Sequence, residues 1–219
     1  MSDNDQPVEN RIEQSCECCD TTAAAETDAR NRWLGESAPL TAELPADLRR
    51  GLGRLLGERP VDTIEEWVGT VRDEVGGGSI GVEDLCHADG ETPHRGVVDG
   101  ETYHFQRFYD AVVLAALADD AVDIRTESPR GTVIEARAVG TDELRVSPEG
   151  AVFSLGVDER VDPPAGNGPT HADVYGAVCP YVRAFPDRAA YERWARSAGA
   201  ATIAMPLAGA TELASALVE

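Results

Sequence analysis

The residues of this chain that could do chemistry are its thiols, which fall into three groups along the sequence. Cys16, Cys18 and Cys19 cluster near the N-terminus, Cys86 precedes a histidine, and Cys179 follows an apolar stretch. Thiolates are favoured ligands of soft metal ions such as Hg(II) and Cu(I), and they also bind Zn(II). The thiols therefore indicate soft-metal chemistry or, for a single buried cysteine, a small apolar residue of the core.

Cys179 is the most informative of these thiols because of its surroundings. Residues 174–182 are mostly apolar and predict a buried strand, and residues 187–197 predict a helix directly after it. We expect Cys179 at the end of that strand, close to a helix start. It is then either an inert core residue or a reactive ligand.

The other thiols also allow two interpretations each. Three thiols within four residues favour metal handling by the N-terminal cluster, and the alternative is a cluster with no defined role. Cys86 has His87 beside it and two further histidines nearby, but these spacings fit no standard zinc pattern. Cys86 is then a metal ligand or an ordinary residue of a loop.

The elements that must position these thiols divide the chain into three parts. Residues 1–42 predict a flexible acidic arm, because they contain few large apolar residues. Residues 43–106 predict a winged-helix-like subdomain that consists of a helix-turn-helix unit followed by a hairpin. The second helix of the unit is expected to start with a capping box of Asp62 and Glu65. The hairpin is expected near residues 97–105, where glycines mark its turns. Residues 107–219 predict the main domain.

The main domain has strands in its middle and helices at its ends. Helices are expected over residues 108–118, over 187–197 and from 206 onward, and strands over 122–126, 132–139, 143–146, 152–157 and 201–205. This order predicts an α+β fold, in which a mixed, mainly antiparallel sheet has flanking helices.

The charge of the chain excludes several classes of partner. There are 40 acidic residues against 19 basic ones, all of them arginine, for a formal net charge of -21. Such a surface repels nucleic acid and anionic membranes, and acidic residues in the second helix of the helix-turn-helix unit argue against DNA binding there. With no apolar span and no signal-peptide pattern, the sequence predicts a cytoplasmic protein in a high-salt, halophilic cytosol.

Four stretches of the sequence together resemble the organomercurial (alkylmercury) lyase family. They are residues 55–61, the Phe108-Tyr109-Asp110 segment with the helix after it, residues 131–157, and residues 177–195 around Cys179. The resemblance spans about residues 45–219 and depends on the order and spacing of these stretches. It implies an alkylmercury-lyase-like fold and a role in detoxification.

The resemblance also implies the chemistry of the site. Members of the family bind an organomercurial on two cysteine thiolates and use an aspartate as the proton donor. Cys179 corresponds to the family's second cysteine, and Asp110 to its aspartate. The implied reaction is protonolysis of a carbon–mercury bond to hydrocarbon and Hg(II), with no organic cofactor.

The chain departs from the family at the first cysteine, where it has Arg107. Arginine cannot ligate mercury, and beside Asp110 it is expected to depress the pKa of the carboxyl. The second thiol would then come from Cys16, Cys18 or Cys19 on the arm, or from Cys86. The alternatives are a non-catalytic carrier or sensor of an organomercurial or another soft metal ion, and a zinc-binding structural module built on the arm. A released metal ion would need a thiol acceptor, and the arm could serve.

Overall fold

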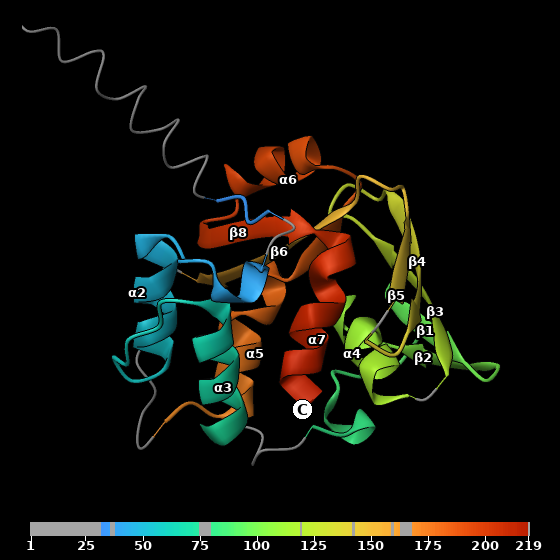
Figure 1. The fold of residues 1–219 in the computed structure, drawn as a ribbon, viewed down its shortest axis with the longest axis horizontal. Helices are drawn as coiled ribbons and strands as arrows, with labels where there is room; N and C mark the ends of the chain where they lie inside the picture. The colour runs from blue at the N-terminus through green and yellow to red at the C-terminus, as the bar shows by residue number, and fades with distance from the viewer. Residues whose placement is uncertain are drawn as a thin grey trace, which may run out of the picture.

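The computed structural model describes residues 32–35, 38–74, 80–118, 120–141, 143–158, 160–162 and 168–218, and it has the α+β class that the sequence predicts (Figure 1). The helices are α2 (Ala46–Leu55), α3 (Ile64–Glu74), α4 (Tyr109–Leu117), α5 (His171–Ala177), α6 (Arg188–Ala195) and α7 (Ala210–Val218). Short 3-10 helices are η1 (Pro39–Thr41), η2 (Val82–Asp84), η3 (Cys179–Tyr181) and η4 (Leu207–Gly209). The strands form two antiparallel sheets.

The larger sheet has the strand order β2-β1-β3-β4-β5. Its strands are β1 (Arg95–Val98), β2 (Glu101–His104), β3 (Ala121–Glu127), β4 (Val133–Val139) and β5 (Glu143–Ser147). Alternate residues of β3, namely Val122, Ile124 and Thr126, are buried, because successive side chains of a strand point to opposite faces. The buried face packs against α4 (Figure 1).

The smaller sheet has the order β7-β6-β8 and contacts both α2 and α6. Its strands are β6 (Val152–Asp158), β7 (Arg183–Phe185) and β8 (Ala200–Pro206). Six consecutive residues of β6 are buried, because α2 and α6 both contact this strand. A Cβ at Gly156 would lie 2.7 Å from Thr202 Cγ2, so β6 and β8 approach more closely there than any larger residue permits.

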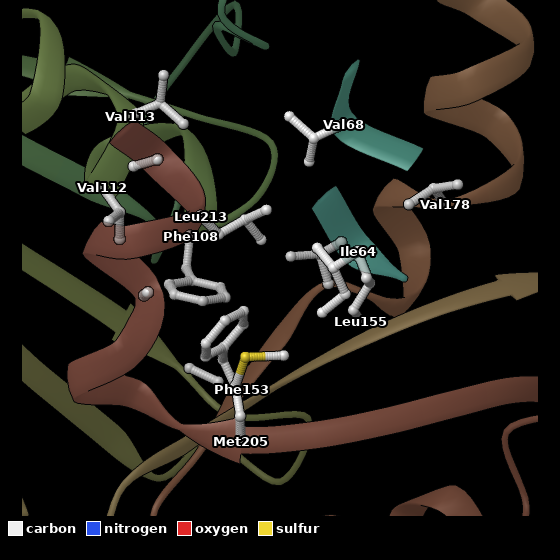
Figure 2. Close-up of a cluster of buried hydrophobic side chains, with 14 of the residues drawn as sticks. Ile64, Val68, Phe108, Val112, Val113, Phe153, Leu155, Val178, Met205 and Leu213 are labelled. Atoms are coloured by element: carbon white, nitrogen blue, oxygen red, sulfur yellow. The ribbon is translucent and has the colours of Figure 1, made fainter. Parts of the chain in front are cut away.

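A continuous hydrophobic core joins both sheets to the helices. It includes Ile64 of α3, Val112 of α4, and Leu155 of β6. Figure 2 shows the Phe108 and Phe153 rings meeting in this core, with ring centroids 6.2 Å apart. The division expected between residues 106 and 107 stays a prediction, but the shared core and the pairing of β1 with β3 both cross it.

The hairpin expected as a wing forms β1 and β2. It turns at Asp99 and Gly100, both of which have positive φ, as a two-residue hairpin loop requires. Because β1 also pairs with β3, the hairpin is the edge of the five-stranded sheet. The sequence therefore predicted the hairpin but not its place in that sheet.

The cap of α3 differs from the expected one by one residue. Thr63 Oγ1 accepts a hydrogen bond from the N–H of Glu66 (3.2 Å), and Glu66 Oε2 accepts one from the N–H of Asp62 (2.8 Å). The Asp62 carboxylate instead bonds to Arg49. The expected pair of Asp62 and Glu65 was wrong because the adjacent Thr63 and Glu66 have the same spacing.

The strand expected around Cys179 was also wrong, since residues 171–177 form helix α5 and Cys179 begins the 3-10 helix η3. Thr170 and Asp173 cap α5 reciprocally: Thr170 Oγ1 accepts from the N–H of Asp173 (3.3 Å), and the Asp173 carboxylate accepts from the N–H of Thr170 (2.8 Å). A short apolar run does not distinguish a buried strand from a helix, and this cap decides in favour of the helix.

Candidate functional site

Asp110 lies in the first turn of α4, directly beside Cys86. The backbone N–H of Cys86 donates a hydrogen bond of 3.0 Å to Asp110 Oδ1. The N–H of Gln106 donates a second bond, of 2.9 Å, to the carbonyl oxygen of Cys86. These two bonds tie the segment before the hairpin to the start of α4, so a thiol and a carboxyl that are 24 residues apart in the sequence lie together.

The pKa of the Asp110 carboxyl is raised. Burial is the main cause, and the backbone N–H groups of Cys86 and Asp110 and the charges of His87 and Arg107 oppose it only in part. Arg107 lowers this pKa, as expected, but loss of hydration outweighs the nearby cation, so the net shift of the pKa is upward. A carboxyl with a raised pKa keeps its proton to higher pH, as a proton donor requires.

Cys179 is half-buried at the first position of η3. Burial, with the charges of Asp110 and Cys86, raises the pKa of its thiol to about 12, and the charge of Arg107 opposes them. The electrostatic influence of Asp110 and Cys86 indicates that all three groups share one site. A thiol with so high a pKa is protonated at neutral pH, so a metal ion that binds it must displace the proton.

Cys86 also has a half-buried thiol. Burial and the charge of Asp110 raise its pKa, whereas a hydrogen bond with the side chain of Tyr175 and the charge of Arg107 lower it. Cys86 and Cys179 are thus two free thiols in distant segments of the chain, and Asp110 raises the pKa of both.

Tyr175 is a site residue that the sequence analysis missed. Its hydroxyl donates a hydrogen bond of 2.9 Å to the carbonyl oxygen of Asp84, and its side chain also hydrogen bonds to Cys86. Tyr175 therefore connects α5, which leads to Cys179, with the segment that carries Cys86. Tyr175 and Cys179 are four residues apart, which is about one helical turn. The sequence analysis missed this spacing because it expected a strand there.

Replacing Tyr175 with phenylalanine is expected to make Cys86 less reactive. When Cys86 is a thiolate, the hydroxyl can donate its one proton to the sulfur instead of to Asp84 and so lower the pKa of this thiol. Removal of the hydroxyl should therefore raise this pKa and slow alkylation by iodoacetamide at pH 8. About tenfold is expected, the factor that corresponds to one hydrogen bond to a charged group. Peptide mass spectrometry over a pH series measures the rate at each cysteine separately.

The matched control is Tyr181→Phe, which removes a hydroxyl whose hydrogen bond is with Asp158. This variant should leave the pH profile of Cys86 as it is in the wild type. An unchanged Cys86 profile in Tyr175→Phe would show that the hydroxyl does not act on the thiol.

A cavity of about 140 Å³ adjoins these groups and has a mostly apolar lining. Its walls come from α3, α4, α5, α7 and β6, and among these α7 contacts both α3 and α4. The apolar lining includes Trp67, Val113, Val178 and Leu213. The polar lining is Asp84, Arg107, Asp110, Tyr175 and Cys179, which we call the polar group of the cavity. The space suits a small apolar molecule that presents one reactive atom to this group.

Arg107 lies among the polar group of the cavity. Its Nη1 donates a hydrogen bond of 2.6 Å to the carbonyl oxygen of Gln106, and its buried Nε has no hydrogen-bond partner. A guanidinium has no lone pair to offer a metal ion. Arg107 can act here only through its charge and its N–H groups.

The histidines near Cys86 have structural partners. His87 Nε2 hydrogen bonds to the carbonyl oxygen of Val82 (2.8 Å), and His94 Nδ1 to Thr126 Oγ1 (2.6 Å). His104 Nδ1 accepts from a backbone N–H at 3.1 Å. Within the residues that the structure describes, no three His, Cys, Asp or Glu side chains are grouped as a metal site. Two thiols do not need such a group to bind Hg(II), which prefers few, soft ligands.

Two further expectations concern the rest of the chain. The cluster of Cys16, Cys18 and Cys19 lies outside the described residues. Among the described helices, none combines the length and the apolar character needed to cross a bilayer.

Comparison with known proteins bears on the same part of the chain. The sequence profile of the alkylmercury lyase (MerB) family matches residues 88–219. A crystal structure of the mercury-bound form of MerB2 is similar at 18% sequence identity and a TM-score of 0.45. The match covers 58% of this chain and 58% of that one, so the similarity spans little more than half of the solved protein. The curated proteins include no match.

Proposed function

The chain belongs to the alkylmercury lyase family, and from this membership and the geometry of the site we propose that it cleaves the carbon–mercury bond of an organomercurial. The reaction is a protonolysis, in which the organic group leaves as hydrocarbon and Hg(II) stays on protein thiolates. Thiolate ligands and one acidic proton are sufficient for this chemistry, so the proposal includes no organic cofactor.

Cys179 and Cys86 are the proposed mercury ligands. As each thiol binds the mercury of R–Hg⁺, it loses its proton to solvent, and sulfur donates electron density to the metal. The added density weakens the bond between carbon and mercury. Asp110 then gives its proton to the carbon, which keeps the electron pair of the broken bond and leaves as R–H. Asp110 becomes a carboxylate, and Hg(II) remains bound to two thiolates.

One observation carries this proposal: Asp110 and Cys179 line the same apolar cavity, and Cys86 adjoins the Asp110 carboxyl through its backbone N–H. The hydrogen bond from the Cys86 N–H holds the carboxyl in place. Burial keeps the carboxyl protonated to higher pH, as the donor role requires. The cavity supplies an apolar space for the organic group.

In this proposal Cys86 replaces the family's first cysteine, which this chain lacks. The resemblance puts Arg107 at that position, and arginine cannot ligate mercury. Cys86 adjoins the same carboxyl from a different part of the backbone. Its thiol thus has the same neighbour that the missing cysteine would have.

Replacing Cys86 with serine is therefore expected to reduce hydrocarbon release strongly. In a single-turnover experiment with thiol-reduced protein and methylmercury, wild-type protein should release about one equivalent of methane and retain one equivalent of Hg(II). Cys86→Ser should release methane at least about 100-fold more slowly, since removing a ligand costs more than the 10–100-fold typical of an outer-shell partner. Methane is measured by gas chromatography and mercury by mass spectrometry.

The variant with Cys16, Cys18 and Cys19 all changed to serine tests the other source of a second thiol. It should release methane at the wild-type rate. If this triple variant loses methane release while Cys86→Ser keeps it, the arm supplies the ligand and the assignment of Cys86 is wrong.

The second candidate function is that of a carrier for an organomercurial or another soft metal ion, and Arg107 is the observation that favours it. Its charge lies close to the thiols that would bind a cationic metal. A carrier would bind methylmercury stoichiometrically and release no methane. The same single-turnover experiment therefore separates the two functions.

We also propose a high-salt cytosol as the setting. The excess of 40 acidic over 19 basic residues leaves a large self-repulsion, which concentrated salt screens. Hg(II) left on two thiolates needs another thiol for its removal, and we propose the cluster of Cys16, Cys18 and Cys19 as the acceptor.

A further inference from the structure

Ser154 is a buried polar residue of β6 that the proposed reaction does not use. Its exposure is 0%, and the other buried residues of this strand are apolar. The Ser154 hydroxyl donates a hydrogen bond of 2.7 Å to the carbonyl oxygen of Tyr181, the last residue of η3. A buried hydroxyl is costly unless it is hydrogen bonded, so the contact with η3, which begins at Cys179, accounts for a serine at this position.

The ladder between β6 and β7 ends where η3 begins. Ser154 pairs with Arg183 at the end of that ladder, and Tyr181 lies two residues before Arg183, outside it. A side chain of β6 rather than its backbone therefore supplies the donor for the Tyr181 carbonyl. The carbonyl oxygen of Arg183 is more distant from the hydroxyl, at 3.5 Å, so the single proton of Ser154 is directed mainly to Tyr181.

Side chains complete the hydrogen bonds of η3. Two backbone bonds of the 3-10 type, of 2.9 and 3.2 Å, close the turn, and the second ends on the Cys179 carbonyl. The carbonyl oxygen of Pro180 accepts instead from Arg183 Nε (2.7 Å). That of Tyr181 accepts from Ser154 Oγ. Because short 3-10 helices have poor hydrogen-bond geometry, these two side-chain bonds fix the turn, and Ser154 provides the fully buried one.

Gly156, two residues after Ser154, lets η3 approach β6 closely. A Cβ at Gly156 would come within 2.9 Å of Tyr181 Cβ, so a larger residue would push the turn away. Leu155, between these two positions, points to the opposite face of the strand and lines the cavity together with Cys179. β6 thus contacts η3 through Ser154 and Gly156 and forms part of the cavity wall through Leu155, which fixes Cys179 relative to that wall.

We propose that Ser154 is a positioning residue for Cys179: its hydroxyl holds η3 on β6, so that the thiol stays in the wall of the cavity that Asp110 also lines. This inference rests on the proposed function, because it concerns the placement of a mercury ligand. Since Ser154 is fully buried, it acts only through the Tyr181 carbonyl. Proton transfer to carbon requires closely matched positions of donor and acceptor, whereas a bond between sulfur and mercury can follow a displaced ligand. Loss of the hydroxyl should therefore slow cleavage more than it weakens binding.

The test is Ser154→Ala in the full chain, which leaves the Tyr181 carbonyl without its donor. In a single turnover with methylmercury, this variant should still bind about one equivalent of mercury. Its methane release should be about 10–100-fold slower, since a displacement of about 1 Å in a reacting group can cost about 100-fold. Ser154→Thr keeps the hydroxyl and should release methane at close to the wild-type rate. A wild-type rate in Ser154→Ala would overturn the proposal, as would an equal slowing in Ser154→Thr.

Thr126→Val is the matched control, because it removes a comparably buried hydroxyl from the other sheet. Thr126 is 2% exposed, and its Oγ1 lies 2.6 Å from His94 Nδ1. The variant should lose stability as Ser154→Ala does, which thermal melts compare, and should release methane at the wild-type rate. If Thr126→Val slowed methane release as much as Ser154→Ala, the effect would come from general loss of stability and the positioning role would be wrong.

Hydrogen exchange measures the position of η3 without mercury. The N–H groups of Tyr181 and Val182 make the two backbone bonds of the turn. In Ser154→Ala they should exchange about tenfold faster than in the wild type, the factor that corresponds to one hydrogen bond, while the amides of α4 keep their rates. Unchanged exchange at Tyr181 and Val182 would overturn the inference whether or not a mercurial is cleaved. Faster exchange at both, with no methane from the wild type, would support the positioning of η3 and overturn the proposed function alone.

Discussion

Replacing Cys179 with serine is expected to abolish both hydrocarbon release and retention of Hg(II). Serine has almost the same shape, but its hydroxyl is a hard ligand that a soft metal ion does not favour. Cys179 lines the cavity beside Asp110, so no other described thiol can take its place there without moving the backbone. The loss should exceed the roughly 10–100-fold that follows removal of an outer-shell partner of a metal site.

The measurement is single-turnover methane release from methylmercury, with bound mercury determined after gel filtration. Since the thiol is half-buried and forms no structural bond that serine cannot form, the thermal melt of Cys179→Ser should stay close to that of the wild type. Methane release at the wild-type rate from a folded Cys179→Ser protein would exclude Cys179 as a ligand. Loss of methane with retention of mercury would instead assign it a role in the chemical step alone.

Replacing Asp110 with asparagine is expected to stop the proton transfer while leaving mercury binding intact. The amide oxygen can still accept the hydrogen bond from the Cys86 N–H, so the arrangement of the site should persist. The amide cannot donate a proton to carbon as an acid does. Hydrocarbon release should fall by about 10²–10⁴-fold, the usual contribution of a general acid.

The pH dependence of the wild type provides a second measure of the same role. The donor must be protonated, and burial raises the pKa of Asp110. The rate of protonolysis should therefore be highest below this raised pKa and fall as the pH rises through it. Asp110→Asn should lose this decline together with most of the rate.

Asp120→Asn is the matched control for Asp110→Asn, because it makes the same substitution at an exposed position. It should keep the wild-type rate and pH profile. A wild-type rate in Asp110→Asn would require another proton donor. Loss of bound methylmercury in that variant would mean that Asp110 holds the ligands in place rather than donating the proton.

Much of the fold followed from patterns within single elements. The strands β3, β4 and β6 were predicted to within one residue at each end. In β3 and β4 buried and more exposed residues alternate, because the two faces of each strand have different surroundings, whereas β6 is buried on both faces. The apolar run before residue 118 predicted α4, and Asp187 predicted the start of α6, where its carboxylate accepts a hydrogen bond from the N–H of Ala190 (2.7 Å).

The errors arose where two local signals compete. At α3, two adjacent residue pairs have the spacing of a capping box, and the actual cap is one residue later than expected. At α5, a short apolar run resembles both a buried strand and a helix, and the side chains of Thr170 and Asp173 decide between them.

The residue types were enough to indicate soft-metal chemistry and to single out Cys179, and the resemblance to the lyase family added Asp110. The grouping of Cys86 and Tyr175 with them depends on contacts between segments distant in sequence: the hydrogen bond from Cys86 to Asp110, and the one from Tyr175 to Asp84. The pKa of Asp110 depends on the same packing, because burial outweighs the charge of Arg107. Neighbours in the chain reveal which charges are near, but only the packed fold determines how much water each charge loses.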